Sequence, residues 1–485
     1  MRWNFVFFCF AMVTVVSASF AQDSGDGIRA LKKEVESLRK QCAEYQQANA
    51  RLEKRLEQLE KRLGAMQGQE RPQAAKKTGD INLFDQLPNY LTRGFEFTGY
   101  FRSGSGVNNR GGKMEAFQAP DAPAKYRLGN EQDTYLETTF AQKNWNPDPD
   151  GVALKTQVTL AYQTQENQSW DETNKVILAE AYGEMGNFLE TDPNMKVWAG
   201  KRFYRLPQLE LNDFYLYDLS GYGGGLGDIK FFNLGKLDIA YIGYSSTDTT
   251  LSTSRGRIAK NNLNLMLKEV NVPGGKGTFW VNGGYVRQGT YSGTSYPDAG
   301  GVDLGFMHQA NSKDANNQLG LQYGYGACTS LSAGAINMPL TGSDRESWRV
   351  RLTDMYNKKF TDRLSLQAVS VYQYTDNGSD TDYRETWMSF GLRPVYGLTK
   401  HLALEIEPGV DYVDNPRDSY DSYLFKFTTA LRLSPNAAFD SHPRFRIFAT
   451  YAHWGENFKG HVGGSEAFND NTDGVNVGVQ CEHWW

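Results

Sequence analysis

The chain ends on Val475-Asn-Val-Gly-Val-Gln-Cys-Glu-His-Trp-Trp485, a stretch in which two kinds of side chain alternate. In an extended strand, one face would carry Val475, Val477, Val479, Cys481 and Trp485, and the other face Asn476, Gly478, Gln480, Glu482 and Trp484. An apolar face, a polar face and a terminal aromatic residue are typical of a strand between lipid and a water-filled lumen. The stretch therefore predicts a transmembrane β-barrel strand.

The same alternation recurs upstream, with charged residues at the second positions. Glu405, Glu407 and Asp411 alternate with apolar residues in 402–412, and Lys426 and Arg432 do so in 423–433. Because these charges cannot all face lipid, we expect their face to line a water-filled lumen. A soluble β-sandwich could show this in a few strands. About 16 to 18 candidate strands in 94–485 instead predict an all-β barrel wide enough for an aqueous channel.

The first residues predict secretion. Arg2 provides a positive charge, Phe5 to Val16 is a short apolar core, and Ser19-Phe20-Ala21 is a small-x-small cleavage site, so 1–21 is expected to be a signal peptide. No later apolar run is long enough for a spanning helix.

Between the signal peptide and the barrel, residues 22–64 predict a periplasmic coiled coil. Heptad a positions carry Ile28, Val35, Cys42, Asn49, Leu56 and Leu63, and d positions carry Leu31, Leu38, Tyr45, Leu52 and Leu59. The alternative is a single amphipathic helix folded back on the barrel. The coiled coil could contact peptidoglycan or a periplasmic binding protein, or act as a spacer. Residues 65–93 are polar and aperiodic, and we expect a linker.

Composition excludes several classes of function. The net charge of −5 and the absence of a basic tract argue against nucleic-acid binding. Four cysteines at unrelated spacings give no disulfide framework or zinc motif, and no cofactor is expected. The six histidines accompany no nucleophile elbow, so an outer-membrane barrel enzyme is disfavoured. A glycosidase-like pair at Glu405 and Glu407 is also disfavoured, because both lie among other charges on one strand face.

Several stretches resemble the maltoporin family of sugar-specific outer-membrane porins. They include Phe97-Thr-Gly-Tyr-Phe-Arg-Ser-Gly104, Lys125-Tyr-Arg-Leu-Gly-Asn-Glu131, Val197-Trp-Ala-Gly-Lys-Arg-Phe-Tyr204 and Phe445-Arg-Ile-Phe-Ala-Thr-Tyr-Ala-His-Trp454. The predicted coiled coil makes the chain most similar to the sucrose-porin branch. The resemblance implies an 18-stranded antiparallel barrel in the lipid of a Gram-negative outer membrane. It also implies a homotrimer and passive diffusion of di- or oligosaccharides of the sucrose or maltodextrin class.

The resemblance also implies a sugar path of stacking aromatic rings, the slide, beside hydrogen-bonding side chains, the polar track. Binding at each point must be weak enough for the sugar to leave. The slide positions match Tyr100, Tyr135 and Trp484, and Trp170 matches an aromatic residue that reaches into the neighbouring protomer. The track positions match Arg102, Arg127 and Glu137, and the constriction matches Asp213, Tyr215 and Asp218.

The chain departs from the family pattern at several positions. Two slide aromatics fall at Asn316 and Asp440, and two track arginines fall at Ala179 and Leu206, the second beside Arg205. A loop disulfide would fall at Ala116 and Gln132 and is absent. A shorter slide and a sparser track suit a disaccharide or a different class of sugar.

Three plainer alternatives stay open. Trp170 could be an ordinary loop aromatic. Tyr100 and Trp484 could be rim aromatics, and Arg102 and Arg127 could only balance nearby carboxylates. A general, nonspecific porin is the alternative function.

Overall fold

A computed structural model describes residues 94–131, 133–143, 151–164, 175–247, 257–291, 294–331, 343–378, 384–463 and 466–485. The predicted signal peptide, coiled coil and linker lie outside the described residues, and so does Trp170. Among the helices in these ranges, none is long and apolar enough to cross a membrane.

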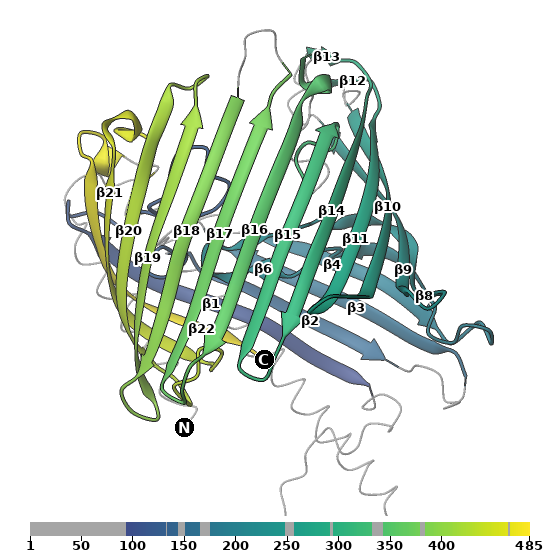
Figure 1. Ribbon diagram of the computed structural model, residues 1–485, viewed down its shortest axis with the longest axis horizontal. Coiled ribbons are helices and arrows are strands. Elements are labelled where there is room, and N and C mark those ends of the chain that lie inside the picture. Colours follow the sequence, from purple (N-terminus) through teal and green to yellow (C-terminus); the bar gives the residue numbers. More distant parts are fainter. Residues whose placement is uncertain are drawn as a thin grey trace, which may run out of the picture. The chain divides into compact units, whose positions relative to one another are not determined.

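Eighteen antiparallel strands of the described chain form one closed barrel, which confirms the predicted fold (Figure 1). The barrel closes where the first strand pairs with the last, with Tyr100 opposite Trp484. The strands are β1 (Phe95–Asn108), β2 (Tyr135–Lys143), β3 (Ala153–Gln163), β4 (Lys175–Gly186), β5 (Lys196–Arg202), β8 (Gly221–Phe231), β9 (Gly235–Thr247), β10 (Arg257–Val272), β11 (Gly275–Val286), β14 (Ala299–Asn311), β15 (Ala315–Gly326), β16 (Trp348–Lys359), β17 (Leu364–Asp376), β18 (Arg384–Gly397), β19 (Leu402–Asn415), β20 (Tyr420–Leu433), β21 (Arg444–Trp454) and β22 (Asp473–Trp484).

Side-chain burial follows the predicted period of two. In β22, Val479 is 52% exposed on the outer face, whereas its neighbours Gln480 and Glu482 on the inner face are buried. In β20, Leu431 is 46% exposed and Arg432 is fully buried. In these strands the exposed apolar residues therefore form the outer surface of the barrel, as expected for a surface in contact with lipid.

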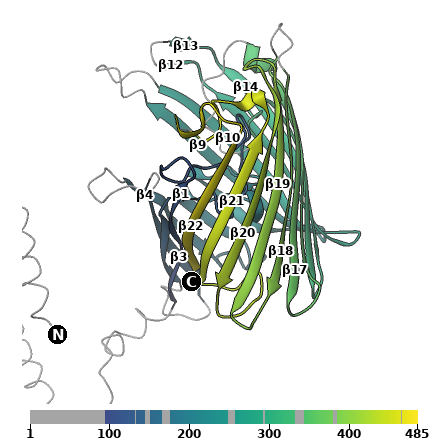
Figure 2. The same ribbon diagram turned by 90° about the vertical axis from the view of Figure 1, so that its left-hand side faces the viewer.

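The two ends of the barrel differ in their connections (Figures 1 and 2). Short turns join strands at the end where the chain terminates, including the predicted turn at 397–401, where the Leu398 amide donates to the Leu402 carbonyl. Longer connections lie at the other end. The predicted loop at 289–302 contains the hairpin β12 (Gly289–Tyr291) and β13 (Thr294–Tyr296), and 455–473 contains η4 (Glu456–Phe458) and η5 (Glu466–Phe468). Another short helix, η3 (Ser343–Glu346), precedes β16. The predicted loop at 245–258 and turn at 146–151 lie largely outside the described residues.

Two of the long connections fold into the lumen. We name residues 109–134, between β1 and β2, the first loop, and residues 203–220, between β5 and β8, the crossing loop. The crossing loop contains β6 (Gln208–Leu209), η2 (Glu210–Asn212) and β7 (Phe214–Tyr215). The two loops meet where the Arg127 amide donates to the Leu211 carbonyl over 3.0 Å.

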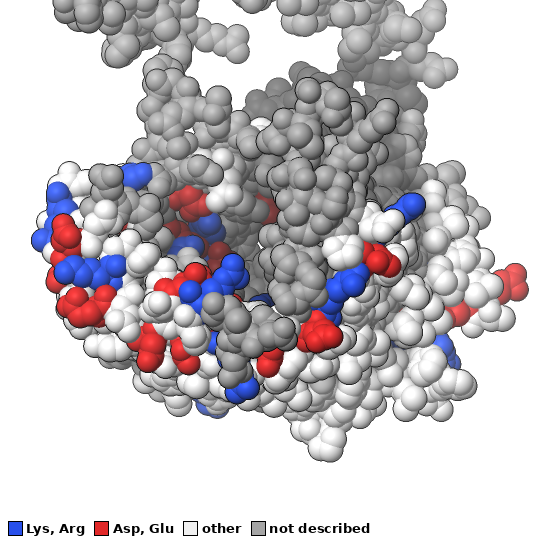
Figure 3. All heavy atoms as spheres, turned by 90° about the horizontal axis from the view of Figure 1, so that it is seen from above, with Lys and Arg blue, Asp and Glu red and all other residues white. Residues whose placement is uncertain are grey.

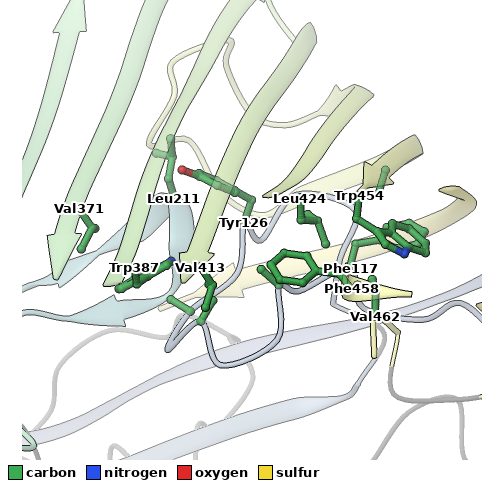
Figure 4. Packing of buried hydrophobic residues seen from close by; sticks show 14 of the residues in the cluster. Phe117, Tyr126, Leu211, Val371, Trp387, Val413, Leu424, Trp454, Phe458 and Val462 are labelled. Atoms are coloured by element: carbon green, nitrogen blue, oxygen red, sulfur yellow. The ribbon is translucent and has the colours of Figure 1, made fainter. Parts of the chain in front are cut away.

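The first loop packs against the inner wall of β17 to β21 (Figure 4). The Phe117 ring packs at a tilt against Trp454 and Phe468, and Tyr126 lies over the cross-strand pair Gly391 and Gly409. A Cβ atom at either glycine would overlap the Tyr126 ring, so glycine is required at both positions. The Tyr126 hydroxyl and the Ser389 Oγ are 2.8 Å apart. The loop is therefore docked by ring packing and by buried hydrogen bonds.

This docking corrects one expectation about the inner wall. Glu405, Glu407, Lys426 and Arg432 point inward as predicted, but they are buried and do not face open water. Lys426 Nζ donates to the Leu128 carbonyl over 2.6 Å and to Glu407 over 2.8 Å, and Arg432 donates to Glu405 over 2.8 Å. Charges can be buried here because each is paired. The first loop thus closes the lumen along β18 to β21.

Candidate functional site

Three aromatic rings lie side by side on the inner wall where the barrel closes. The ring centroids of Tyr100 and Trp484 are 6.4 Å apart, and those of Tyr100 and Tyr135 are 6.0 Å apart. Strand register produces this row. Tyr100 on β1 is opposite Trp484 on β22, and Arg102 on β1 is opposite Tyr135 on β2. The structure therefore brings the three described slide candidates together. We name Tyr135, Tyr100 and Trp484 the aromatic row.

The two predicted track arginines lie beside the row, but both are already paired. Arg102 donates to both carboxylate oxygens of Asp133, over 3.1 and 2.9 Å, and its Nη1 is 3.2 Å from Glu131. Arg127 donates to Glu131 over 2.8 Å, to the Tyr100 hydroxyl over 2.7 Å and to Glu482 over 3.1 Å. The guanidinium donors of both residues are thus largely occupied within the protein.

These arginines also fix the charge of Glu131, which belongs to the first loop. Burial alone would raise the pKa of its carboxyl group. Arg127 and Arg102 outweigh that effect and hold the pKa below the usual glutamate value. Glu131 is therefore ionised at neutral pH and joins the first loop to β1.

The Trp484 end of the row joins a second network. Glu482 accepts from Arg446 over 2.8 Å and lies 3.5 Å from Arg444, whose guanidinium carbon is 4.6 Å from the centre of the Trp484 ring. Between these groups and the two loops there is a cavity of only about 10 Å³, lined in part by Arg393 and Glu210. A space of that size holds one water molecule at most, so no sugar fits in this cavity.

The predicted constriction residues all lie on the crossing loop. Asp213 has a left-handed backbone with φ of 54°, accepts a hydrogen bond from Gln208, and lies 3.9 Å from Arg102. Its side chain is 33% exposed. Asp218 accepts from the Ser220 amide over 2.8 Å. Glu210 anchors the loop to the opposite wall, 3.1 Å from Gln367 and 3.5 Å from Arg444.

A cavity of about 790 Å³ remains open on the other side of the crossing loop. It lies where β5, only seven residues long, ends and the chain turns into the lumen. Tyr135, Glu137, Phe203 and Arg205 line it from within, and Tyr222 lies at its outer edge. Glu137 accepts a hydrogen bond from the Tyr135 hydroxyl. Viewed from the end with the long loops, the barrel is hollowed, and acidic and basic side chains surround the hollow (Figure 3).

Arg205 is a cavity residue that was not among the site residues predicted from the sequence. Its guanidinium carbon is 3.9 Å from the centre of the Phe203 ring and 4.3 Å from that of the Tyr215 ring. Among the described residues, no hydrogen bond or ion pair engages its side chain. The neighbouring Leu206 is buried in an apolar cluster with Tyr204 and Leu216. The only sequence signal for Arg205 was its place beside Leu206.

The family model for the LamB porin matches residues 95–485 of the chain. The chain belongs to the LamB porin family. It is therefore an outer-membrane porin, a channel and not an enzyme, and the apolar outer face of its barrel meets the lipid of that membrane.

Several solved porin structures are similar to this LamB porin at low identity. A BenF-like porin from Pseudomonas fluorescens Pf-5 matches with 10% identity and a TM-score of 0.45, covering 81% of this chain and 99% of its own. OpdK from Pseudomonas aeruginosa matches with the same identity and coverage and a TM-score of 0.44. OmpT of Vibrio cholerae matches with 11% identity and a TM-score of 0.35, covering 81% and 97%.

The positions where this LamB porin departs from the expected slide and track can now be located. Asn316 lies on β15 and donates to Asn311, and Asp440 lies in the turn before β21, so neither extends the aromatic row. Ala179 lines the large cavity. Beyond Trp484, the ring that continues the row is His442, whose centroid is 4.4 Å from that of Trp484. The aromatic row in the described chain is thus short, and a histidine ring lies at its end.

Proposed function

We propose that this porin selectively passes neutral di- and oligosaccharides by passive diffusion and that sucrose-sized sugars suit it best. The aromatic row beside the open cavity is the observation that carries the proposal. A sugar has apolar C–H faces that stack on aromatic rings and a rim of hydroxyl groups that needs donors and acceptors. Rings about 6 Å apart can pass a sugar from one stacking contact to the next, and exposed contacts of this kind are individually weak.

The hydrogen-bonding partners of the sugar differ from those that the sequence suggested. Arg102 and Arg127 act as positioning residues in this proposal, because Asp133, Glu131 and Glu482 already accept their hydrogen bonds. Arg205 instead offers its donors to the cavity. The rings of Phe203 and Tyr215 fix the orientation of its guanidinium group. Glu137 provides an acceptor beside Tyr135. Asp213, Tyr215 and Asp218 border the same passage on the crossing loop.

The size of the preferred sugar follows from the length of the path. With Asn316 and Asp440 in place of aromatic residues, the row has too few rings to contact every unit of a long maltodextrin. A disaccharide is shorter and needs fewer rings. In the described part of the chain, a cavity of about 790 Å³ stays open beside the crossing loop. That volume falls in the range of pockets that enclose small organic ligands.

The assembly that we propose is a homotrimer, with the coiled coils of residues 22–64 joined in the periplasm. The unbroken heptad seam of the sequence supports self-association of this segment. Trp170 would complete the path from a neighbouring protomer. A contact with peptidoglycan or a periplasmic binding protein remains a further role for the coiled coil.

Liposome swelling tests the proposal against a nonspecific porin. Liposomes that contain the protein would be placed in isosmotic solutions of mono- to heptasaccharides and of sugar-free polyols of matched size. A sugar-selective path should admit sucrose and maltose faster than polyols of equal size. Swelling that depends on solute size alone would assign the protein to the nonspecific class.

The variant Arg205→Met tests the assignment of the donor. It keeps the length and the apolar stem of the side chain and removes the guanidinium, so sucrose entry should slow while ion conductance persists. Arg345→Met is the control, since Arg345 lies near an outer loop and pairs with Asp298 over 3.4 Å. Equal sugar entry in both variants would remove Arg205 from the path.

A further inference from the structure

Two histidines face each other at the short-turn end of the barrel. His442 lies in the turn between β20 and β21, and His483 precedes Trp484 in β22. Their Nδ1 atoms are 3.3 Å apart, and both side chains are partly exposed. The His442 ring also contacts Trp484, with a centroid distance of 4.4 Å, and the His483 ring is 5.7 Å from that of Trp485. The pair is thus accessible and is held by aromatic contacts on both sides.

The separation of the two nitrogens matches that of two ligands on one metal ion. Zinc–imidazole bonds are about 2.0–2.1 Å long, so two imidazole nitrogens on a tetrahedral zinc ion lie about 3.3–3.4 Å apart. Without metal, the same spacing accommodates an N–H···N hydrogen bond between neutral rings. Binding a cation requires that the ring with hydrogen on Nδ1 shift to the Nε2–H tautomer and that the rings turn until both Nδ1 lone pairs point at the ion. Both rings then remain neutral, and no proton has to leave the pair.

The surroundings of His442 disfavour its charged form. Burial, His483 and Arg444 lower the pKa of His442, and Asp440 and Glu482 act in the opposite direction. Arg444 stays engaged with Trp484 and Glu482.

We propose that His442 and His483 form a binding site for a divalent transition-metal ion of the Zn²⁺, Cu²⁺ or Ni²⁺ class. In the described parts of the chain, no group of three or more His, Cys, Asp or Glu side chains converges on one point. Water molecules would therefore complete the coordination, and binding is weaker than at a structural zinc site. A bound ion would fix the His442 ring against Trp484. This consequence for the aromatic row rests on the proposed function, whereas metal binding does not.

Copper titration followed by electron paramagnetic resonance tests the site directly. The purified full-length protein should give a Cu²⁺ spectrum with coupling to two nitrogens. His442→Ala and His483→Ala should each weaken binding at least about tenfold, because loss of an outer-shell partner alone costs 10–100-fold. His453→Ala is the matched control, since His453 lies beside Tyr423, with ring centroids 6.0 Å apart, and away from the pair.

The results of these experiments distinguish metal binding at the histidine pair from its proposed effect on the sugar path. Equal copper binding by the native protein and by both single variants would overturn the site, and His442→Gln guards against a variant that fails to fold. A second measurement adds Zn²⁺ on the short-turn side during sucrose block of the channel. If copper binds at the pair but zinc leaves sucrose block unchanged, the link to Trp484 is wrong. If no sugar blocks the channel at all, the proposed function fails, and the copper result still decides the site.

Discussion

At the scale of single residues, strand parity and register locate the inner aromatic rings, but they do not reveal which charges are free. Tyr100 and Trp484 could be placed inward because each falls on the polar face of its strand. The pairing of Arg102 with Asp133, and of Arg127 with Glu482, could not be predicted. These partners meet only after the first loop folds inward. The position of Arg205 at the cavity could not be predicted for the same reason, because it depends on the conformation of the crossing loop and not on strand alternation.

The aromatic row gives the first prediction. Tyr100→Ala, Tyr135→Ala and Trp484→Ala should each weaken sucrose block of the single-channel current by about 1 kcal/mol or more, or about fivefold in affinity, because each removes a stacking face. Ion conductance should stay similar or rise. Tyr100→Phe separates the ring from its hydroxyl, and Tyr396→Ala on the outer face is the control. Unchanged block in all three alanine variants would remove these residues from the sugar path.

Asp213 gives the second prediction. Asp213 and Asp218 lie on the crossing loop, Asp133 lies on the first loop and Glu137 lies on β2, and the nearby arginines are Arg102 and Arg205. Surplus acidic charge favours cations, so the open channel should be cation-selective, and Asp213→Asn should reduce that preference. Reversal potentials in a salt gradient measure both. A preference for anions in the native channel would show that this charge assignment is wrong.

At the scale of elements, the strands were predictable and the inward loops were not. Each strand carries its own signal in the alternation of its residues, as 402–412 and 423–433 do. The docking of the first loop depends instead on contacts with residues far along the chain, such as Tyr126 with Ser389 and Leu128 with Lys426. For that reason the inner face of β19 and β20, predicted to be wet, is packed.

The packing of the Tyr126 ring over Gly391 and Gly409 gives the third prediction. In Gly391→Ala, the added methyl group would overlap the Tyr126 ring, so the first loop must shift. Overpacking of this kind costs about 1–3 kcal/mol, and the variant should melt at lower temperature and conduct more. Gly283→Ala on β11 is the matched control, because a Cβ there would meet nothing within 4 Å. If both variants melt and conduct alike, the packing of Tyr126 over Gly391 does not hold the first loop in place.

At the scale of the whole molecule, the barrel and its family could be predicted because the signals extend from Phe97 to Trp485. The closed sheet of eighteen described strands and the family match over residues 95–485 confirm both. The preferred solute could not be predicted from the sequence, since in the proposed function it depends on how Arg205, Glu137 and the crossing loop share one cavity. The coiled coil stays a prediction, because its residues lie outside the described ranges.

Assembly gives the fourth prediction. The protein should be a trimer in mild detergent, and deletion of residues 22–64 should leave a trimeric, conducting pore. The reason is that the barrel, and not the heptad seam, is expected to fix the number of subunits. Asn49 at an a position leaves two- and three-stranded coils both possible. Size exclusion with light scattering measures the mass, and monomers after the deletion would show that the barrel contacts do not suffice.

The claim that this porin is specific for small sugars is tested most directly by sugar-induced block of single-channel current. Sucrose and maltohexaose would be titrated separately against the native protein, with a polyol of sucrose size as control. The predicted result is saturable block by sucrose at concentrations where the polyol has no effect, with maltohexaose bound no more tightly than sucrose. Absence of block by either sugar would contradict a sugar-selective pore, and maltohexaose binding far tighter than sucrose would contradict the short slide.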